Sequence, residues 1–446
     1  MIYSINSCID ADDKIHVSRQ FCLNNNLNEN CIYNLSIGKQ TKGAKVIIDS
    51  RCRDDELRVS KGVMEYLHIP DGIRFQLKIT GDIIRLGPVI GLLMGLKTKS
   101  IKKGMLRQML NYTKVYSKLG GLLFVFCEEG IDYKSRLIEG YFYSPDRRPE
   151  SRPWEKALLP FPDSIFQRII LPDETIKKLK KLTDNRMFNS RYFNKWKFWE
   201  LVSRYDDIRE HIPYTKRVVS FDDIKYMLTQ HKCIYLKPIN GTLARGLVRV
   251  LYDNGSYLIK AKDSREDSEV HSEDELFKEL SYIVENKNYI AQQALYPVML
   301  NDRPIDFRVI MQKDDSLNWQ CTGIVAFIGM HGGICSNWGF VTTFDDALID
   351  ALNFSRHESY TMKQEVIGIC RKICTVLDST GENYGDLGFD VLIDVDLNVW
   401  VLEANKKHYH SVPLWIKDRQ TFYAVKANPI KYAAALAGFE ANAGQP

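Results

Sequence analysis

The sequence lacks the features that mark several large classes of protein. Ten cysteines are scattered along the chain and none form a Cys-x-x-Cys pair, so a structural zinc site is not indicated. The longest apolar run covers residues 86–96, which is shorter than the roughly 20 apolar residues of a membrane-spanning helix. The first residues are polar and acidic, whereas a secretory signal begins with a basic and then a long apolar stretch. These absences predict a cytoplasmic protein without a membrane partner.

The chain also lacks a strong excess of charge of either sign. The formal net charge is +5 over 446 residues, which disfavours a nucleic-acid partner and only slightly favours anionic ligands. Apolar residues make up 45% of the sequence and charged residues 26%, which is typical of a globular protein with a full core. At about 100–200 residues per domain, this length predicts two or three domains.

Hydrophobic patterning divides the chain into four stretches. Residues 1–80 alternate short strands with polar turns and predict a small β-rich unit. Residues 81–165 alternate strands with a helix, which predicts an α/β domain with a parallel sheet, and the proline-rich stretch 144–162 predicts a linker or exposed loop. Residues 166–440 predict one larger α+β unit, and residues 441–446 predict a frayed tail.

A β-hairpin with an unusual charge pattern is predicted over residues 388–405. A two-residue turn at 396–397 would place Asp390 directly opposite Glu403. Like charges that face each other in a sheet destabilise it by about 0.2–1 kcal/mol, and a bound divalent cation would remove that cost. Asp, Glu and Asn oxygens are ligands that Mg²⁺ accepts, so Asp390, Glu403 and Asn405 predict a metal site. The alternative, a hairpin whose charges are simply hydrated, stays open.

Side-chain alternation assigns the two faces of this hairpin. One face carries the acids and the amide, and the other is wholly apolar and is expected in the core. The residues expected to face the core are Phe389, Val391, Ile393, Trp400, Leu402 and Ala404.

Cationic residues in the same unit predict partners for an anionic ligand. Lys237 lies inside an apolar strand and, if buried, needs a negatively charged partner. The glycine-containing turn 240–246 can bring backbone N–H groups close to a phosphate, although most such turns are only turns. Asp306 and Arg308 share the polar face of a strand over residues 304–312. They form either a structural ion pair or a clamped arginine aimed at a phosphoryl group.

His408 and His410 lie on one side of a segment that is expected to be extended. They could ligate a metal or transfer protons. Two histidines without a third partner, however, are more often at the surface or in contact with substrate. The sequence leaves their role open.

In order along the chain, these segments resemble the ATP-grasp superfamily, and most of all its YheC/YheD type, which is associated with endospore coats. The resemblance covers residues 85–410, and its most specific motif is Glu403-Ala404-Asn405. The segments that carry it are residues 85–91, 194–196, 211–215, 237–246, 289–295, 306–308, 387–390 and 401–405.

This resemblance implies an α+β, ATP-grasp fold in which two α+β subdomains clamp a nucleotide. An α/β pre-ATP-grasp domain and a small β-rich amino-terminal unit would precede it. The implied cofactors are ATP and one or two Mg²⁺ ions, which Asp390, Glu403 and Asn405 would hold. Arg308 would steady the γ-phosphate, and Lys237 would act on the phosphates with it. The residues implied in nucleotide binding are Lys195, Lys237, Gly241, Gly246, Gln292, Gln293, Ala294 and Leu295, the last four as a hinge beside the adenine.

The activity implied by the resemblance is an ATP- and Mg²⁺-dependent carboxylate–amine ligase. ATP would phosphorylate a carboxylate to an acyl phosphate, and an amine would attack it to form an amide, with release of ADP and phosphate. The expected partners are a carboxylate substrate and an amine acceptor, either a peptide or an amino acid. Two alternatives stay open: a structural protein of a spore coat that keeps the fold with little or no turnover, and a kinase that stops at phosphorylation.

Several positions depart from the family pattern on the substrate side. Phe327 lies where related proteins commonly carry an arginine that touches phosphate or substrate. Ala244 replaces a glycine of the turn, which implies a stiffer lid, and residues 406–410 replace a turn of small residues and proline. Asn337 is a further candidate to line the site. ATP and Mg²⁺ binding stay expected, whereas the acceptor stays unidentified.

Overall fold

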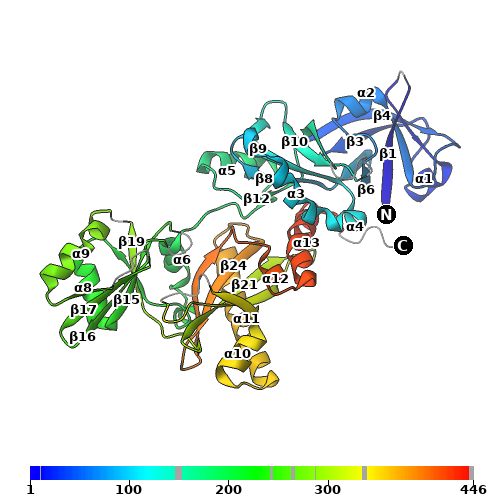
Figure 1. Ribbon diagram of the computed structural model, residues 1–446. Helices are drawn as coiled ribbons and strands as arrows, with labels where there is room; N and C mark the ends of the chain where they lie inside the picture. The colour runs from blue at the N-terminus through cyan, green and yellow to red at the C-terminus, as the bar shows by residue number, and fades with distance from the viewer. Residues whose placement is uncertain are drawn as a thin grey trace.

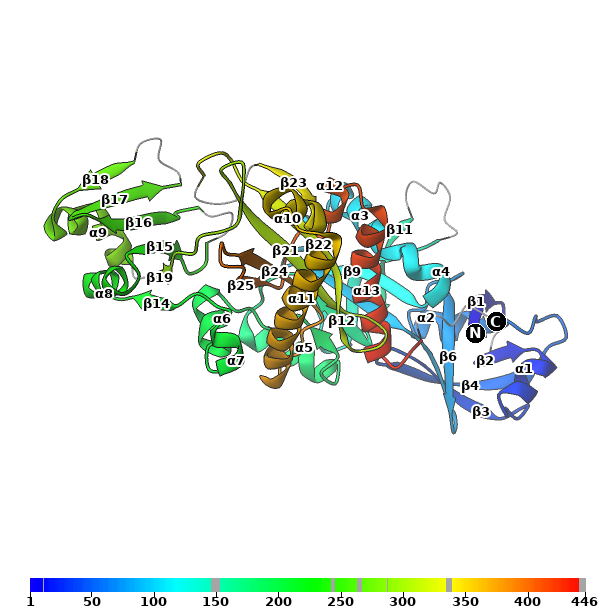
Figure 2. The ribbon, with the colours of Figure 1, turned by 90° about the horizontal axis from the view of Figure 1, so that it is seen from below.

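The computed structural model describes residues 1–10, 12–145, 153–241, 245–262, 267–286, 288–333 and 339–440. These residues form four β-sheets, and Figures 1 and 2 show them in an elongated arrangement in which the fourth sheet lies between the second and the third. Within these ranges, no helix combines the length and apolar character that crossing a membrane requires.

The first sheet closes into a barrel in the order β1-β5-β2-β4-β3-β7-β6. Alternate side chains of each strand point inward, and Ile15, Leu35 and Val46 are among those fully buried inside. Closure pairs the edge strands with each other, so the barrel presents no free edge. The strands are β1 (Ile2–Cys8), β2 (Lys14–Val17), β3 (Ile32–Ile37), β4 (Gln40–Ile48), β5 (Glu56–Ser60), β6 (Arg74–Thr80) and β7 (Ile83–Gly87).

The second sheet has the order β11-β10-β9-β8-β12-β13 and is mixed. Its strands are β8 (Val89–Gly95), β9 (Leu122–Asp132), β10 (Leu137–Tyr143), β11 (Trp154–Pro160), β12 (Ser164–Gln167) and β13 (Met187–Phe188). β8 pairs in parallel with β9 and β12, as expected, whereas β10 is antiparallel to both of its neighbours.

Strand β11 lies inside the stretch that was expected to be a linker. That prediction is wrong for residues 154–160, which pair with β10 along their whole length. Two of the five prolines that suggested a linker, Pro153 and Pro160, fall at the ends of an edge strand, where a missing N–H group is tolerated.

The third and fourth sheets lie on either side of the candidate site. The third has the order β14-β19-β15-β16-β17-β18, and the fourth has the order β23-β22-β21-β24-β25 with β20 paired to β21. The strands of the third are β14 (Thr215–Val218), β15 (Cys233–Pro238), β16 (Val248–Asp253), β17 (Ser256–Ala261), β18 (Ser268–Val270) and β19 (Tyr289–Gln293). Those of the fourth are β20 (Met299–Leu300), β21 (Arg303–Lys313), β22 (Trp319–Ile328), β23 (Phe340–Thr343), β24 (Asp386–Ile393) and β25 (Val399–Asn405).

Helices cover these sheets and connect them. α11 packs on the fourth sheet (Figure 2), where its Val366 and Cys370 join the same core as Phe307. α6 contacts both β14 and β25 and so lies between the third and fourth sheets. α13 returns to the second sheet, where Ile430 packs in one cluster with Ile90.

The bounds of the helices complete the fold. They are α1 (Arg19–Asn24), α2 (Lys61–Tyr66), η1 (Thr98–Ser100), α3 (Lys103–Met109), η2 (Leu110–Val115), α4 (Tyr116–Leu119), α5 (Asp173–Leu182), α6 (Lys195–Val202), α7 (Asp206–Arg209), α8 (Phe221–His231), α9 (Glu273–Asn286), α10 (Phe344–Leu352), α11 (Arg356–Ser379), α12 (Val412–Trp415) and α13 (Arg419–Leu436).

The β24–β25 hairpin forms as predicted, but its turn and one of its faces differ. Ile393 pairs with Val399, so the turn is longer than the expected two residues. The Asp394 carboxylate holds this turn by accepting hydrogen bonds from backbone N–H groups, including that of Asn398 at 2.8 Å. A β-bulge then adds one residue, Leu402, to β25 and shifts the pairing back.

The longer turn changes which residues of β25 face the core between the turn and the bulge. Val399 and Val401 are fully buried, whereas Trp400 and Leu402 are only half-buried. The prediction that Trp400 and Leu402 face the core is therefore wrong, because a one-residue shift turns each side chain to the other face. The other four predicted core residues, Phe389, Val391, Ile393 and Ala404, are buried.

A buried asparagine fastens the start of β24 to the segment that leads into α6. Asn189 is fully buried, and its side-chain oxygen accepts from the backbone N–H groups of Gly385 at 3.0 Å and Asp386 at 3.2 Å. Its amide nitrogen donates to the carbonyl oxygens of Asp386 at 2.7 Å and Lys406 at 3.2 Å. One side chain thus joins three stretches of chain.

Removal of this amide should destabilise the protein. Asn189 has a positive φ of 52°, so Asn189→Gly keeps the backbone conformation and deletes only the side chain. Because two buried N–H groups lose their acceptor, we expect the free energy of unfolding to fall by about 2–4 kcal/mol in urea denaturation.

The matched control is Asn185→Gly, at an exposed residue whose φ is 61°. It should change the free energy of unfolding by about 0.5 kcal/mol or less. Equal effects of the two substitutions would contradict a structural role for the Asn189 amide.

Candidate functional site

The three predicted metal ligands lie together at the end of the β24–β25 hairpin. Asp390 pairs with Glu403 across the hairpin, as the sequence predicted. Asn405 donates a hydrogen bond from its amide nitrogen to Glu403 Oε1 at 2.8 Å. These side chains share the hairpin face opposite the buried Phe389 and Ala404, because side chains alternate along a strand.

Arg308 joins this group from the neighbouring strand β21. It pairs with Asp390 in the sheet, and its Nε donates to Asp390 Oδ1 at 2.6 Å. The sequence had suggested Asp306 as the residue that clamps Arg308. The ion pair runs instead to Asp390, and Asp306 acts on both groups through its charge.

Lys195 connects the third and fourth sheets. It is the first residue of α6, whose amino-terminal end is capped by the Asn194 side chain. Its amine donates to the carbonyl oxygen of Gly241, which follows β15, at 2.6 Å. The same nitrogen lies 3.3 Å from Glu403 Oε2 on β25. One cation on α6 therefore links the glycine turn to the predicted metal ligands, and α6 itself contacts both the third and the fourth sheet (Figure 2).

A buried glutamine accepts a hydrogen bond from Lys237. Lys237 is half-buried, and its amine donates to the side-chain oxygen of Gln292 at 2.6 Å. Gln292 is buried and in turn donates to the Thr215 hydroxyl at 3.0 Å. Lys237 therefore makes a hydrogen bond to a neutral amide, and its charge still acts on Glu403.

The glycine turn is described only in part. Gly246 has a φ of 69°, and a Cβ there would lie 3.0 Å from the Tyr289 hydroxyl, so this position favours glycine. Residues 242–244, and with them Ala244, lie outside the described residues, as does Asn337.

The predicted hinge, Gln292 to Leu295, lies where the chain leaves the third sheet for the fourth. Gln293 donates from its backbone N–H to the Tyr214 carbonyl at 2.8 Å, and Ala294 donates to the Cys233 carbonyl at 3.1 Å. Beyond Leu295, Pro297 bridges to the β24–β25 turn at Asp394. The position of this segment agrees with a connection between two subdomains.

The two opposed acids differ in their protonation. Burial raises the pKa of Asp390 to about 7. The charges of Glu403 and Asp306 act in the same direction, and Arg308 opposes them. Burial also acts to raise the pKa of Glu403, but the charge of Lys195 and the hydrogen bond from Asn405 outweigh it and bring the pKa to about 2. Near neutral pH the pair therefore holds Glu403 ionised and Asp390 partly protonated.

This donor set fits a divalent cation with bound phosphates. Two carboxylates and an amide offer the oxygen ligands that Mg²⁺ takes, and Mg²⁺ usually completes its shell with water and phosphate oxygens. Lys195, Lys237 and Arg308 supply positive charge around those acids. The same cations could receive phosphate oxygens once the metal neutralises the carboxylates.

Phe327 borders the site. It pairs with Asp306 across β21 and β22, and its ring packs edge-on against Trp415 with centroids 6.0 Å apart. The position where an arginine was expected is therefore part of an aromatic contact with α12.

A second cluster lies behind the hairpin and was not recognised from the sequence. His408 Nε2 and His410 Nε2 lie 3.0 Å and 2.8 Å from the two carboxylate oxygens of Asp386. All three side chains are fully buried or nearly so. The expectation that these histidines lie at the surface is therefore wrong, whereas the structure does not test whether they contact substrate. The signal that could have found the cluster is Asp386 itself, an acid at the start of a strand whose only other charged residue is Asp390.

The Asp386 cluster has residue types that bind metal ions, a carboxylate and two imidazoles. One donor atom from each lies within 4.8 Å of the others, which is close enough to share an ion. An arginine already supplies the positive charge. Arg168 Nη1 lies 2.7 Å from His410 Nε2 and 3.2 Å from Asp386 Oδ2. Burial lowers the pKa of both histidines, which keeps the rings neutral at pH 7. We interpret this cluster as a buried ion pair with neutral imidazoles that joins the second and fourth sheets.

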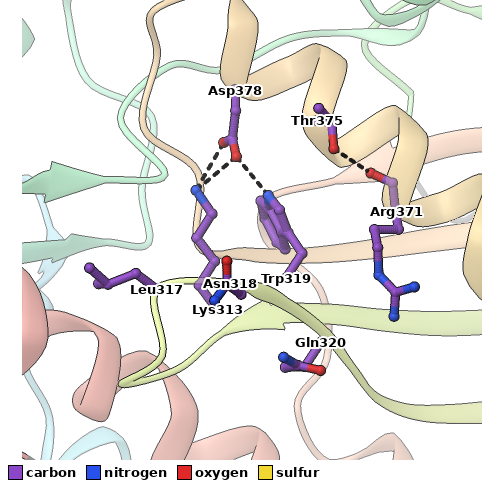
Figure 3. Close-up of a pocket in the computed structure, with 8 residues that line it drawn as sticks. All are labelled: Lys313, Leu317, Asn318, Trp319, Gln320, Arg371, Thr375 and Asp378. Atoms are coloured by element: carbon purple, nitrogen blue, oxygen red, sulfur yellow. Dashed lines mark hydrogen bonds and ion pairs between the residues drawn. The ribbon is translucent and has the colours of Figure 1, made fainter.

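A hollow of about 400 Å³ lies at the far end of α11 and is separate from these groups (Figure 3). The Asp378 carboxylate points to the Lys313 amine at 2.9 Å and accepts from the Trp319 indole N–H at 2.8 Å. These contacts satisfy the acid and fasten the end of α11 to the fourth sheet. None of the predicted site residues is among those that line this hollow.

Comparisons with known proteins all find ATP-grasp proteins or members of one family of them. Residues 184–436 match the family described as YheC/D-like ATP-grasp. The chain is 24% identical over 375 residues to the endospore coat-associated protein YheD of Bacillus subtilis (strain 168), which covers 79% of this chain and 80% of that protein. It is also 24% identical over 276 residues to YheC of the same organism, which covers 58% of this chain and 73% of that protein.

A solved structure of the ATP-grasp ligase PsnB, complexed with the precursor peptide PsnA2 and AMPPNP, is similar in fold at 11% sequence identity. The similarity covers 78% of this chain and 99% of that chain, with a TM-score of 0.45.

The raised pKa of Asp390 predicts a specific pH dependence of stability. A carboxyl group whose pKa is higher in the folded protein contributes stability below its unfolded pKa and loses it as the pH rises through the folded value. The unfolded pKa is about 3.9, and the folded one is about 7. From pH 5 to pH 8, the unfolding free energy of the wild type should therefore fall by about 2 kcal/mol relative to Asp390→Asn.

Urea denaturation at each pH measures this difference, and the subtraction cancels the titration of the other groups. Asp396→Asn, in the exposed hairpin turn, is the matched control and should show no such change. A wild-type stability that stays constant or rises with pH relative to Asp390→Asn would contradict the raised pKa.

Proposed function

The chain belongs to the YheC/D-like ATP-grasp family, and from this premise and the geometry of the β24–β25 site we propose that it is an ATP- and Mg²⁺-dependent carboxylate–amine ligase. The observation that carries the proposal is the meeting of Asp390, Glu403 and Asn405 with Arg308 from the fourth sheet and Lys195 from α6. The three oxygen donors suit a metal ion, and the three cations suit phosphate groups. The site therefore suits a metal-bound polyphosphate better than it suits a metal ion or a polyphosphate alone.

Each predicted residue has a role in this proposal. Glu403 and Asn405 hold Mg²⁺, with Asp390 as a third ligand once it loses its proton. When bound, Mg²⁺ would neutralise charge on the phosphates as they transfer. Arg308 steadies the γ-phosphate, because an arginine has five N–H donors and can keep its Nε on Asp390 while its terminal nitrogens bind oxygen. Lys195 and Lys237 bind phosphate or adenine, and Gln292 orients Lys237.

The backbone at the exit of the third sheet would place the adenine. Residues 292–295 connect two sheets, so movement about this segment would open and close the site around a nucleotide. Lys195 contacts both Gly241, which follows the third sheet, and Glu403 on the fourth sheet. A bound phosphate would take the place of one of these contacts of the Lys195 amine. We also propose that two smaller units, residues 1–80 and 81–165, precede this ATP-grasp unit.

The reaction proposed is a two-step ligation. A substrate carboxylate attacks the γ-phosphorus of ATP, which forms an acyl phosphate and releases ADP. An amine then attacks the acyl carbon, which forms the amide and releases phosphate. The acceptor we propose is a peptide or amino acid, and the place of action is the cytoplasm, with association to a spore coat by analogy with the names of the relatives.

Phe327 favours one competing function. Because an apolar ring occupies the position of an expected arginine, a structural protein of a spore coat that binds nucleotide without turnover is the second candidate. A kinase that stops at the acyl phosphate is the third. All three bind Mg²⁺ and ATP at the same residues, and they differ in the release of ADP and in its dependence on an amine.

Glu403→Gln should abolish ADP release while it preserves the shape of the site. The substitution removes the charge that holds the metal, so we expect turnover to fall by at least about a hundredfold. The measurement is ADP formation by the full chain with ATP, Mg²⁺ and mixtures of carboxylic acids and amines.

Glu365→Gln, on the exposed face of α11, is the matched control and should leave ADP formation unchanged. Nucleotide binding without ADP formation in the wild type, with any acid or amine, would favour the structural function. ADP formation that needs the acid but not the amine would favour the kinase.

A further inference from the structure

A second cavity, whose lining includes the residue that follows β25, has a composition of its own. Its volume is about 290 Å³, and it is lined where α5 meets the segment before α6 and the residue after β25. Ile170, Leu171 and Ile176 form its apolar wall. A cavity of this size is at the small end of ligand sites and suits one small organic molecule.

A buried lysine forms part of the wall of this cavity. Lys406 is only 5% exposed, and its amine donates to the carbonyl oxygen of Asn189 at 2.9 Å. The Tyr192 ring lies beside it, with its centroid 6.0 Å from the amine. A carbonyl oxygen and an aromatic face compensate a buried ammonium less than a carboxylate does. The charge of Glu382 stabilises the ammonium form in part, and an anionic ligand in the cavity would stabilise it further.

The other polar groups of the cavity define where such an anion would lie. Arg191 is exposed and lies 3.6 Å from Glu382, so part of its charge is already balanced. Asp173, the first residue of α5, also lines the cavity and repels a carboxylate. The favourable place for negative charge is therefore beside Lys406, and the apolar wall remains for the rest of the ligand.

Two connections join the cavity to the proposed active site. Lys406 directly follows Asn405, a proposed metal ligand. Tyr192, which lines the cavity, is also close enough to Glu403 that the carboxylate charge adds to burial in raising the pKa of the phenol. The cavity therefore shares Tyr192 and the end of β25 with the surroundings of Glu403.

We propose that this cavity is the carboxylate-substrate subsite, with Lys406 as the residue that recognises a small carboxylic acid carrying an apolar group. The inference rests on the proposed ligase function and adds the chemical class of its acid substrate. Ile170, Leu171 and Ile176 select the apolar group, and Lys406 selects the charge.

The test measures binding of two probes that differ only in charge, 4-methylpentanoate and 4-methylpentanamide. Calorimetry on the full chain without nucleotide should show the acid bound roughly ten- to a hundredfold more tightly than the amide. Lys406→Met keeps the length of the side chain and should weaken acid binding by a similar factor, without changing amide binding. Lys407→Met removes an exposed lysine one residue away and is the matched control, with binding unchanged.

The outcomes separate this inference from the ligase function. Equal binding of acid and amide by the wild type overturns it and needs no variant. So does unchanged acid binding by a Lys406→Met protein that melts at the wild-type temperature. If the acid binds through Lys406 but no acid ever promotes ADP formation, the subsite stands and the ligase function fails. If other acids promote ADP formation independently of Lys406, the function stands and the subsite fails.

Discussion

The structure around the site depends on two carboxylates that face each other across neighbouring strands. Asp390 and Glu403 would repel each other if both were ionised and unpaired. The protein balances them with Arg308 from the same sheet and with Lys195 from α6. These two cations tie the hairpin to its neighbours, and the proton retained by Asp390 reduces the remaining repulsion. A metal ion with bound phosphates would neutralise the two carboxylates and the surrounding cations more completely.

The same balance explains why the site lies between sheets rather than on one of them. The fourth sheet supplies the acids and Arg308, whereas the third sheet and its glycine turn supply Lys237 and the Gly241 carbonyl. The chain crosses between them at residues 292–295, and α6 fills the space between. Behind the hairpin, Asn189 and the Asp386 cluster fix the start of β24 to the second sheet and so hold the acids in place from the rear.

The sequence predicted the acid pair correctly, but for a reason that was only half right. The longer turn displaces β25 by one residue, and the bulge at Leu402 displaces it back, so Asp390 still meets Glu403. The alternation of apolar and polar residues could not predict either change. The longer turn depends on the hydrogen bonds that Asp394 accepts, and the bulge accompanies the burial of Val399 and Val401. The family resemblance supplied Lys195, whose partners come from distant parts of the chain. His408 and His410 were misjudged because their partners, Asp386 and Arg168, are also distant in sequence.

The central claim is that Glu403 and its neighbours hold Mg²⁺ on a nucleotide between the third and fourth sheets. A crystal structure of the full chain with Mg²⁺ and a non-hydrolysable ATP analogue tests it most directly. The account predicts metal–oxygen distances of about 2.1 Å to Glu403 and Asn405, with phosphates at Lys195 and Arg308. A nucleotide bound elsewhere, or a metal bound by Asp386 and the two histidines instead, would contradict it.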